Sequence, residues 1–150
     1  MENLFDTVSA DIKKAMLARD AVRLESLRGI KKEFLEAKTA KGSDGTLSDD
    51  RAIQILSKMV KQRRESAEIY TQQNRPELAE AELAQATVIE EYMPKQLTPE
   101  ELDAALREII ARVGATSPKE MGKVMGVASK RLAGRADGKD ISAKVRELLA

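Results

Sequence analysis

"YMPKQLTPEEL" (residues 92–102) contains both a helix stop and a helix start. Pro94 ends a helix that arrives from its N-terminal side, because proline lacks an amide hydrogen and clashes with the preceding turn. Thr98 and Glu101 then have the spacing of a capping box, in which each side chain bonds the backbone amide of the other residue. Pro99 occupies the first helical position between them, where proline is favoured. The segment is therefore the predicted junction between two helical parts.

Apolar residues recur at helical spacing on both sides of this junction, and no segment alternates as a strand would. In the N-terminal part, Asp20 and Ser48 are predicted helix caps, and Pro76 is the predicted first residue of a fourth, acidic helix that runs to about Tyr92. The inward faces of the first three helices are predicted to contain Leu4, Val8, Ile12, Ala15, Leu24, Leu27, Phe34, Leu35, Ile53, Leu56, Val60, Ala67 and Tyr70.

The C-terminal part is predicted to hold three helices. Gly114 should end the first helix, and a second capping-box spacing, Ser117 to Glu120, should open a helix from Pro118 to about Ala133. The last helix is expected to start at Asp140. We therefore predict an all-α protein, with an N-terminal helical hairpin or bundle region over residues 1–94 and a small C-terminal three-helix domain over residues 95–150.

Composition removes several classes of function. The chain has no cysteine and no histidine, which excludes disulfides, cysteine nucleophiles, Cys/His zinc sites and histidine general bases. No catalytic residue, metal site or cofactor is predicted. The N-terminal segment is acidic and is not a signal peptide, and no apolar run approaches the roughly 18–20 residues that span a bilayer. We therefore expect a soluble, cytoplasmic protein without a membrane partner.

Charge is unevenly distributed along the chain. The total is 26 basic against 25 acidic residues, but residues 1–94 have a net charge of −2, residues 95–150 of +3 and residues 117–146 of +5. A site for a polyanion is therefore expected near the C-terminus. The basic segment "KMVKQRRES" (58–66) is interpreted instead as part of a charged helical hairpin beside the acidic fourth helix. Its expected ion pairs are Lys61–Glu65 and Arg64–Glu68.

Within the basic C-terminal region, "MGKVMG" (121–126) is not a phosphate-binding loop, because the order of glycines and lysine does not fit that motif. As a helix it places Gly122, Gly126, Ser129 and Ala133 in a stripe beside Lys119, Lys123 and Lys130. Each mid-helix glycine costs about 1 kcal/mol relative to alanine. Residue types alone favour a neighbouring helix, from 99–113 or after 140, packed closely on the stripe. The alternative is a phosphate backbone that approaches it while the lysines neutralise its charge.

The segment "GRADGKD" (134–140) offers a second possible anion site. Asp137-Gly138 is a strong turn signal in which Gly138 is free to take a positive φ. Arg135 and Lys139 flank the turn, and a helix N-terminus follows. The simpler interpretation is an ordinary connection between two helices, capped by Asp140. This interpretation and the anion site are compatible.

Six segments carry a family resemblance over essentially the whole chain, namely LRGIKKEF (27–34), VKQRRESAEIY (60–70), ELAEAEL (77–83), IEEYMPKQLTPEEL (89–102), EMGKVMG (120–126) and GRADGKDI (134–141). They resemble the YqeY family (GatB/YqeY domain). That family is related to the tail domain of the B subunit of glutamine-dependent aspartyl/glutamyl-tRNA amidotransferase. The resemblance implies an all-helical protein and, because that tail helps to hold tRNA, it favours the nucleic-acid interpretation. The positions that match the tail are Gly122, Lys123, Gly126, Lys130 and Arg131.

The leading hypothesis is a non-catalytic module that binds tRNA or another structured RNA. Its predicted contacts are Lys119, Gly122, Lys123, Gly126, Lys130, Arg131, Arg135 and Lys139. The alternative is a protein–protein adaptor, for example for an aminoacyl-tRNA-related enzyme. A carbon–nitrogen ligase that takes its amide nitrogen from glutamine ranks last, because neither the catalytic cradle of the B subunit nor an amidase-type Ser/Lys signature is visible and no nucleophile–base pair suggests itself.

Overall fold

The computed structural model describes residues 3–150, and in this range the protein consists of seven α-helices and one 3₁₀ turn, with no strand. The predicted all-α class is confirmed. By their contacts, the residues fall into two compact units, one that ends at Met93 and one that runs from Pro94 to Ala150. Each unit has a hydrophobic core of its own.

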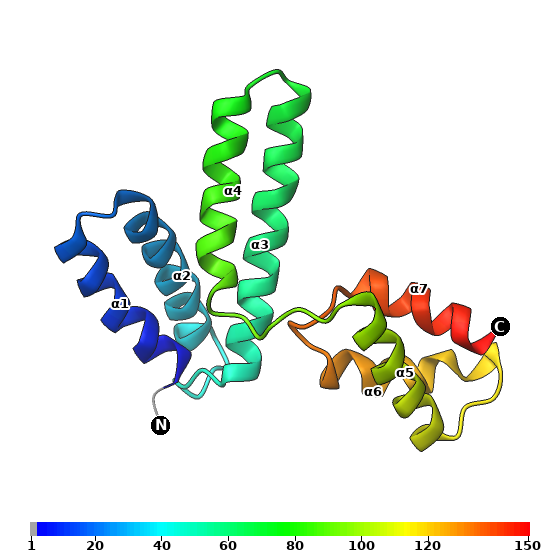
Figure 1. Cartoon of the computed structure of the whole chain (residues 1–150). Coiled ribbons are helices and arrows are strands. Elements are labelled where there is room, and N and C mark those ends of the chain that lie inside the picture. The colour runs from blue at the N-terminus through cyan, green and yellow to red at the C-terminus, as the bar shows by residue number, and fades with distance from the viewer. Residues whose placement is uncertain (1–2) are drawn as a thin grey trace. The chain divides into compact units, whose positions relative to one another are not determined.

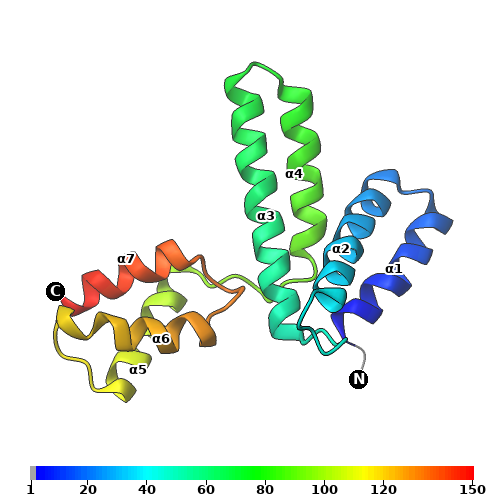
Figure 2. The same ribbon diagram turned by 180° about the vertical axis from the view of Figure 1, so that it is seen from behind.

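The first unit contains α1 (Leu4–Ala18), α2 (Ala21–Thr39), α3 (Asp49–Gln72) and α4 (Pro76–Glu90). α1 packs on α2, α2 packs on α4, and α3 and α4 form a long antiparallel hairpin (Figures 1 and 2). The core cluster includes Val60 and Ala86 but no residue between them in sequence. The distal part of the hairpin, residues 65–84, therefore extends past α1 and α2 as two helices alone, and we call it the arm.

The caps predicted for the first unit are present. Asp20 accepts a hydrogen bond from the amide of Arg23 at 3.1 Å, and Ser48 accepts one from Arg51 at 3.2 Å. Pro76 is the first residue of α4, as predicted, although the helix ends at Glu90. Leu27, Phe34 and Leu56 are fully buried where α2, α3 and α4 meet. These contacts confirm most of the predicted inward positions.

Leu35 was wrongly predicted to be buried, because its side chain is 41% exposed. Successive helical residues point about 100° apart, and Phe34 faces the core, so Leu35 lies on the outward side of α2.

The charged hairpin is confirmed, but its predicted ion pairs are wrong. Arg64 pairs with Glu90 of α4 rather than with Glu68. The Nε atom of Arg63 donates to Gln85 Oε1 at 3.0 Å, and Lys61 takes part in no ion pair within residues 3–150. The reason is that α4 brings acceptors from another helix closer to these arginines than the carboxylates one turn along α3.

The second unit contains α5 (Pro99–Val113), a 3₁₀ turn η1 (Pro118–Glu120), α6 (Met121–Arg131) and α7 (Gly138–Leu149). Thr98 and Glu101 form the predicted capping box, with both hydrogen bonds at 3.1 Å. Gly114 ends α5 in the left-handed region at φ 78°. The core consists of the apolar faces of the three helices, and its fully buried members include Leu106, Val124 and Val145.

Two predictions about the ends of these helices were wrong. The helix expected from Pro118 begins as a 3₁₀ turn, and its α-helical part ends at Arg131. α7 starts before Asp140, because Asp137 is its cap and accepts a hydrogen bond from the amide of Lys139 at 3.0 Å. Gly138 is then the first helical residue and does not take a positive φ. An Asp-Gly pair suits a helix cap as well as a turn.

Candidate nucleic-acid interface

Gly122 and Gly126 lie on an open flank of α6. Both are exposed, and a Cβ atom added to either one would meet no atom beyond its own helix within 4 Å. α5 and α7 pack on α6 at the side of Val124 and Ala128, which are fully buried. The expectation of a helix packed on the glycine stripe is therefore wrong for the residues that the structure describes.

Three lysines accompany this flank. Lys123 and Lys130 are seven residues apart on α6, so they lie on one side of the helix, and Lys119 precedes them in the 3₁₀ turn η1. All three side chains are exposed, and none of them takes part in an ion pair within the described range. We call Lys119, Gly122, Lys123, Gly126 and Lys130 the α6 flank.

Glu120, the acidic residue next to the α6 flank, already accepts hydrogen bonds from the backbone. Glu120 Oε2 accepts hydrogen bonds from the amides of Thr116 at 2.5 Å and Ser117 at 3.3 Å. The amide of Thr116, with help from Ser117 and the charge of Lys123, lowers the pKa of Glu120. The carboxylate thus stays ionised at neutral pH as a cap for the chain entering the helix.

Arg131, which was grouped with these residues, points elsewhere. It lies about 100° around the helix from Lys130, and its Nη2 atom is 3.9 Å from Glu108 Oε1 of α5. The same carboxylate is 3.1 Å from Arg112. The charge of Arg131 is therefore shared with α5 and does not belong to the α6 flank.

Arg135 forms hydrogen bonds to a distant part of the backbone, which the sequence did not predict. Its Nε atom donates to the carbonyl of Lys95 at 3.2 Å, and its own carbonyl accepts from the amide of Leu97 at 2.8 Å. Gln96 adds a 2.6 Å hydrogen bond to the carbonyl of Gly134. The turn before α7 therefore fixes residues 95–97 to the second unit. Nothing local signals which distant segment such a turn will hold.

Lys139 lies exposed in the first turn of α7, between Asp137 and Asp140. Asp137 already accepts a hydrogen bond from the amide of Lys139. The two carboxylates also lie at the positive end of the helix dipole, where their negative charge would repel a bound anion. This arrangement favours the ordinary capped connection over an anion site at the start of α7.

Neither a metal site nor a membrane span is found within residues 3–150. No group of three His, Cys, Asp or Glu residues could hold a metal ion. No helix in this range is both long and apolar enough to cross a bilayer.

Comparison with known proteins gives a family and several relatives. The family model described as Yqey-like protein matches residues 5–149. Among the relatives is altered inheritance of mitochondria protein 41 of Meyerozyma guilliermondii, which is 37% identical over 89 residues, covering 59% of this chain and 45% of the relative. The protein of the same name from Pyrenophora tritici-repentis is 28% identical over 146 residues, covering 95% and 78% of the two chains. The Clavispora lusitaniae protein is 32% identical over 90 residues, covering 60% and 51%. The chain spans about half the length of the Meyerozyma and Clavispora proteins.

These relatives are named as mitochondrial proteins, which conflicts with a purely cytoplasmic location. The expected cytoplasmic location was therefore wrong. It rested on the lack of a secretory signal and of a membrane span, and neither feature separates the cytoplasm from the interior of an organelle. The family model, in contrast, agrees with the resemblance seen in the sequence and covers nearly the whole chain. On this evidence the chain belongs to the YqeY family.

Proposed function

We propose that this YqeY-family protein is a non-catalytic module that binds tRNA or another structured RNA through the α6 flank. The observation that carries the proposal is the open space at Gly122 and Gly126 beside exposed lysines without ion-pair partners. Two glycines in one short helix lower its stability, and no close contact within the second unit compensates. A ligand backbone that needs close approach would supply the missing contact.

The chemistry of the α6 flank suits a phosphate backbone. Lys123 and Lys130 are seven residues apart on α6, which corresponds to roughly 10 Å along a helix, and Lys119 precedes them in η1, so the three ammonium groups can reach different phosphates. Residues 95–150 contain no Phe, Tyr or Trp, so bases cannot stack on aromatic rings of this domain. Recognition would therefore depend on the shape and backbone of the RNA more than on its sequence.

The test is a charge reversal with a matched control. Lys123→Glu with Lys130→Glu should weaken tRNA binding at least about tenfold, since each reversal replaces a phosphate contact with repulsion. The slope of log affinity against log salt should fall by about two. Lys13→Glu with Lys14→Glu makes the same change of net charge on exposed positions of α1 and should leave affinity close to wild type. Equal tRNA affinity for the two double variants, with helicity unchanged in both, would refute the proposal.

A further inference from the structure

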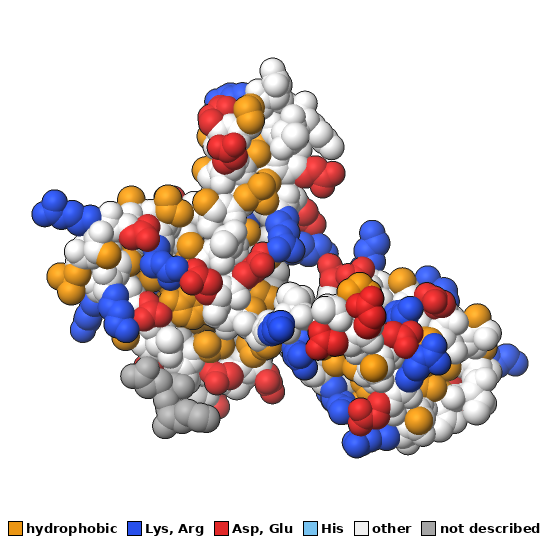
Figure 3. Space-filling model, in the orientation of Figure 1, with side chains coloured by type: hydrophobic (Ala, Val, Ile, Leu, Met, Phe, Trp, Pro, Cys, Tyr) orange, Lys and Arg blue, Asp and Glu red, His pale blue; other side chains and the backbone are white. Residues whose placement is uncertain are grey.

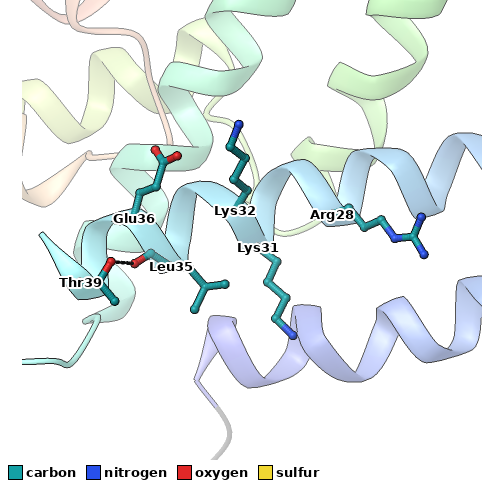
Figure 4. Close-up of a pocket in the computed structure, with 6 residues that line it drawn as sticks. All are labelled: Arg28, Lys31, Lys32, Leu35, Glu36 and Thr39. Atoms are coloured by element: carbon teal, nitrogen blue, oxygen red, sulfur yellow. Dashed lines mark hydrogen bonds between the residues drawn. The ribbon is translucent and has the colours of Figure 1, made fainter.

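The outward side of α2 carries a shallow hollow of about 350 Å³, lined by Arg28, Lys31, Lys32, Leu35, Glu36 and Thr39 (Figure 4). Lys31 and Lys32 leave the helix on opposite sides. Leu35 lies within this basic surface and is 41% exposed. An apolar side chain among cations is a surface that fits an apolar residue accompanied by carboxylates.

The cations of the hollow are not satisfied within their own unit. Arg28 and Lys32 take part in no ion pair within residues 3–150. Lys31 is placed only loosely, with its ammonium 5.9 Å from the centre of the Phe5 ring. The hollow therefore presents a positive surface whose one acidic residue, Glu36, is outnumbered.

A complementary surface lies on the arm of the same protein. On α4 the exposed positions include Glu77, Glu80, Ala81, Leu83 and Thr87, and Leu83 is 47% exposed. α4 itself contains no lysine or arginine, but Arg75 at its N-cap forms an ion pair with Glu77 at 2.9 Å. Acidic and apolar side chains are visible together on the upper part of the hairpin (Figure 3). Glu80, Leu83 and Thr87 share one face of α4, so an apolar residue lies beside a carboxylate there, whereas Ala81 is on the other side of the helix.

The α3 side of the arm is a poorer match for the hollow. It exposes Glu65, Glu68 and Ile69, but Lys61 follows the same side one turn away from Glu65. A cation next to the acidic pair would face the cations of the hollow. On α4 the nearby cation is Arg75, the N-cap residue, and it already pairs with Glu77 at 2.9 Å, whereas Glu80 takes part in no ion pair within the described residues.

The two surfaces do not cover each other within one chain, because Leu35 and Leu83 both remain exposed. α2 runs away from the arm, so that its last turns lie at the end of the unit opposite the tip of the hairpin (Figures 1 and 2). A contact between these surfaces therefore requires two molecules.

We propose that the α2 hollow receives the outward face of α4 from a second copy of this chain. Leu83 of one molecule packs on Leu35 of the other, and Glu80 lies beside Arg28 and Lys32. Glu77, which also pairs with Arg75 of its own chain, lies at the edge of the contact. The complementary charges set the register of the two helices and make the association sensitive to salt. This proposal is independent of RNA binding by the second unit.

A first experiment uses the absence of cysteine from the chain. A Leu35→Cys variant is mixed with a separate Leu83→Cys variant and oxidised, since a disulfide forms only where the two Cβ atoms come within about 4.5 Å. The mixed disulfide should form at least about tenfold faster than that between Leu35→Cys and Leu17→Cys, because Leu17 is 87% exposed but lies outside both surfaces. Equal rates for the two pairs would overturn the proposal.

A second experiment exchanges the charges and follows self-association of nuclease-treated protein by sedimentation at low salt. Arg28→Glu with Lys32→Glu, and Glu77→Lys with Glu80→Lys, should each weaken association at least about tenfold. A mixture of the two double variants should restore it, because each reversed hollow then meets a reversed arm. Lys58→Glu with Lys61→Glu is the charge-matched control on exposed positions of α3 and should associate as wild type does.

The opposite results are equally clear. A wild-type chain that stays monomeric at millimolar concentration, or reversals that have no more effect than the control, would overturn the dimer. If the Arg28/Lys32 variant loses tRNA affinity while self-association is unchanged, the hollow is a nucleic-acid surface and the dimer proposal is wrong.

Discussion

The phenol of Tyr92 donates a 2.6 Å hydrogen bond to Asp11 Oδ2, which ties the residues after α4 to α1. One residue earlier, Glu91 accepts from Arg23 of α2 at 2.6 Å. Met93 packs on the core of the same unit. The chain is thus held to the first unit up to Met93 and to the second unit from Lys95 onward, which leaves Pro94 as the residue between two anchored segments.

Tyr92→Phe should lower the free energy of unfolding by about 1 kcal/mol. The value is below the roughly 1.5–3 kcal/mol typical of a hydrogen bond to a charged group, because the pair is only partly buried. Urea denaturation followed by circular dichroism measures it. Tyr70→Phe is the matched control, since its hydroxyl forms no side-chain hydrogen bond within the described range. The prediction fails if the two substitutions cost the same.

The same pair predicts a loss of stability at high pH. Burial, and next the hydrogen bond to Asp11, raise the pKa of Tyr92 above its ordinary value. A raised pKa in the folded state means that the unfolded chain releases the proton first, so the contribution is present at neutral pH and is lost as pH rises above about 10. Between pH 9 and about 11, wild type should lose more stability than Tyr92→Phe. Parallel pH curves for the two proteins would contradict this assignment.

Local signals were predictable from the sequence, and contacts between distant segments were not. Thr98 and Glu101 are three residues apart, so their spacing alone specified the capping box. The partner of Arg64 depended on where α4 lies, and the attachment of Arg135 to Lys95 joins residues forty apart. For the candidate site, the spacing of Lys123 and Lys130 correctly predicted that they lie on the same exposed side of a helix. The sequence could not reveal that Gly126 faces open space, because glycine is equally compatible with a packed helix.

The two-domain organisation proposed from the junction has a direct test. A fragment of residues 94–150 contains its own core, including Leu106, Val124 and Val145, and domains of about 55–65 residues often fold alone. It should show helical circular dichroism and a cooperative thermal transition. Leu106→Ala should cost the fragment roughly 2–5 kcal/mol, because the side chain is fully buried. A gradual, non-cooperative melt of the wild-type fragment would contradict independent folding.

Gly126→Ala separates helix stability from ligand binding in a single change. The position is in the interior of α6, and an added Cβ meets nothing beyond its own helix within 4 Å. Alanine should therefore raise the free energy of unfolding by up to about 1 kcal/mol, mainly because the unfolded chain loses conformational freedom. If an RNA backbone contacts the α6 flank, the same methyl group should lower tRNA affinity several-fold while no charge changes.

Gly29→Ala provides the control for Gly126→Ala, because Gly29 is also helical but lies in α2 of the first unit. There the added Cβ would lie 3.5 Å from Arg63 Nη2, an ordinary contact, so the fold should accept it. tRNA affinity should stay at the wild-type level, since α2 does not belong to the α6 flank. A more stable Gly126→Ala protein with unchanged tRNA affinity would mean that no backbone approaches this flank. The glycines would then have to be explained without RNA.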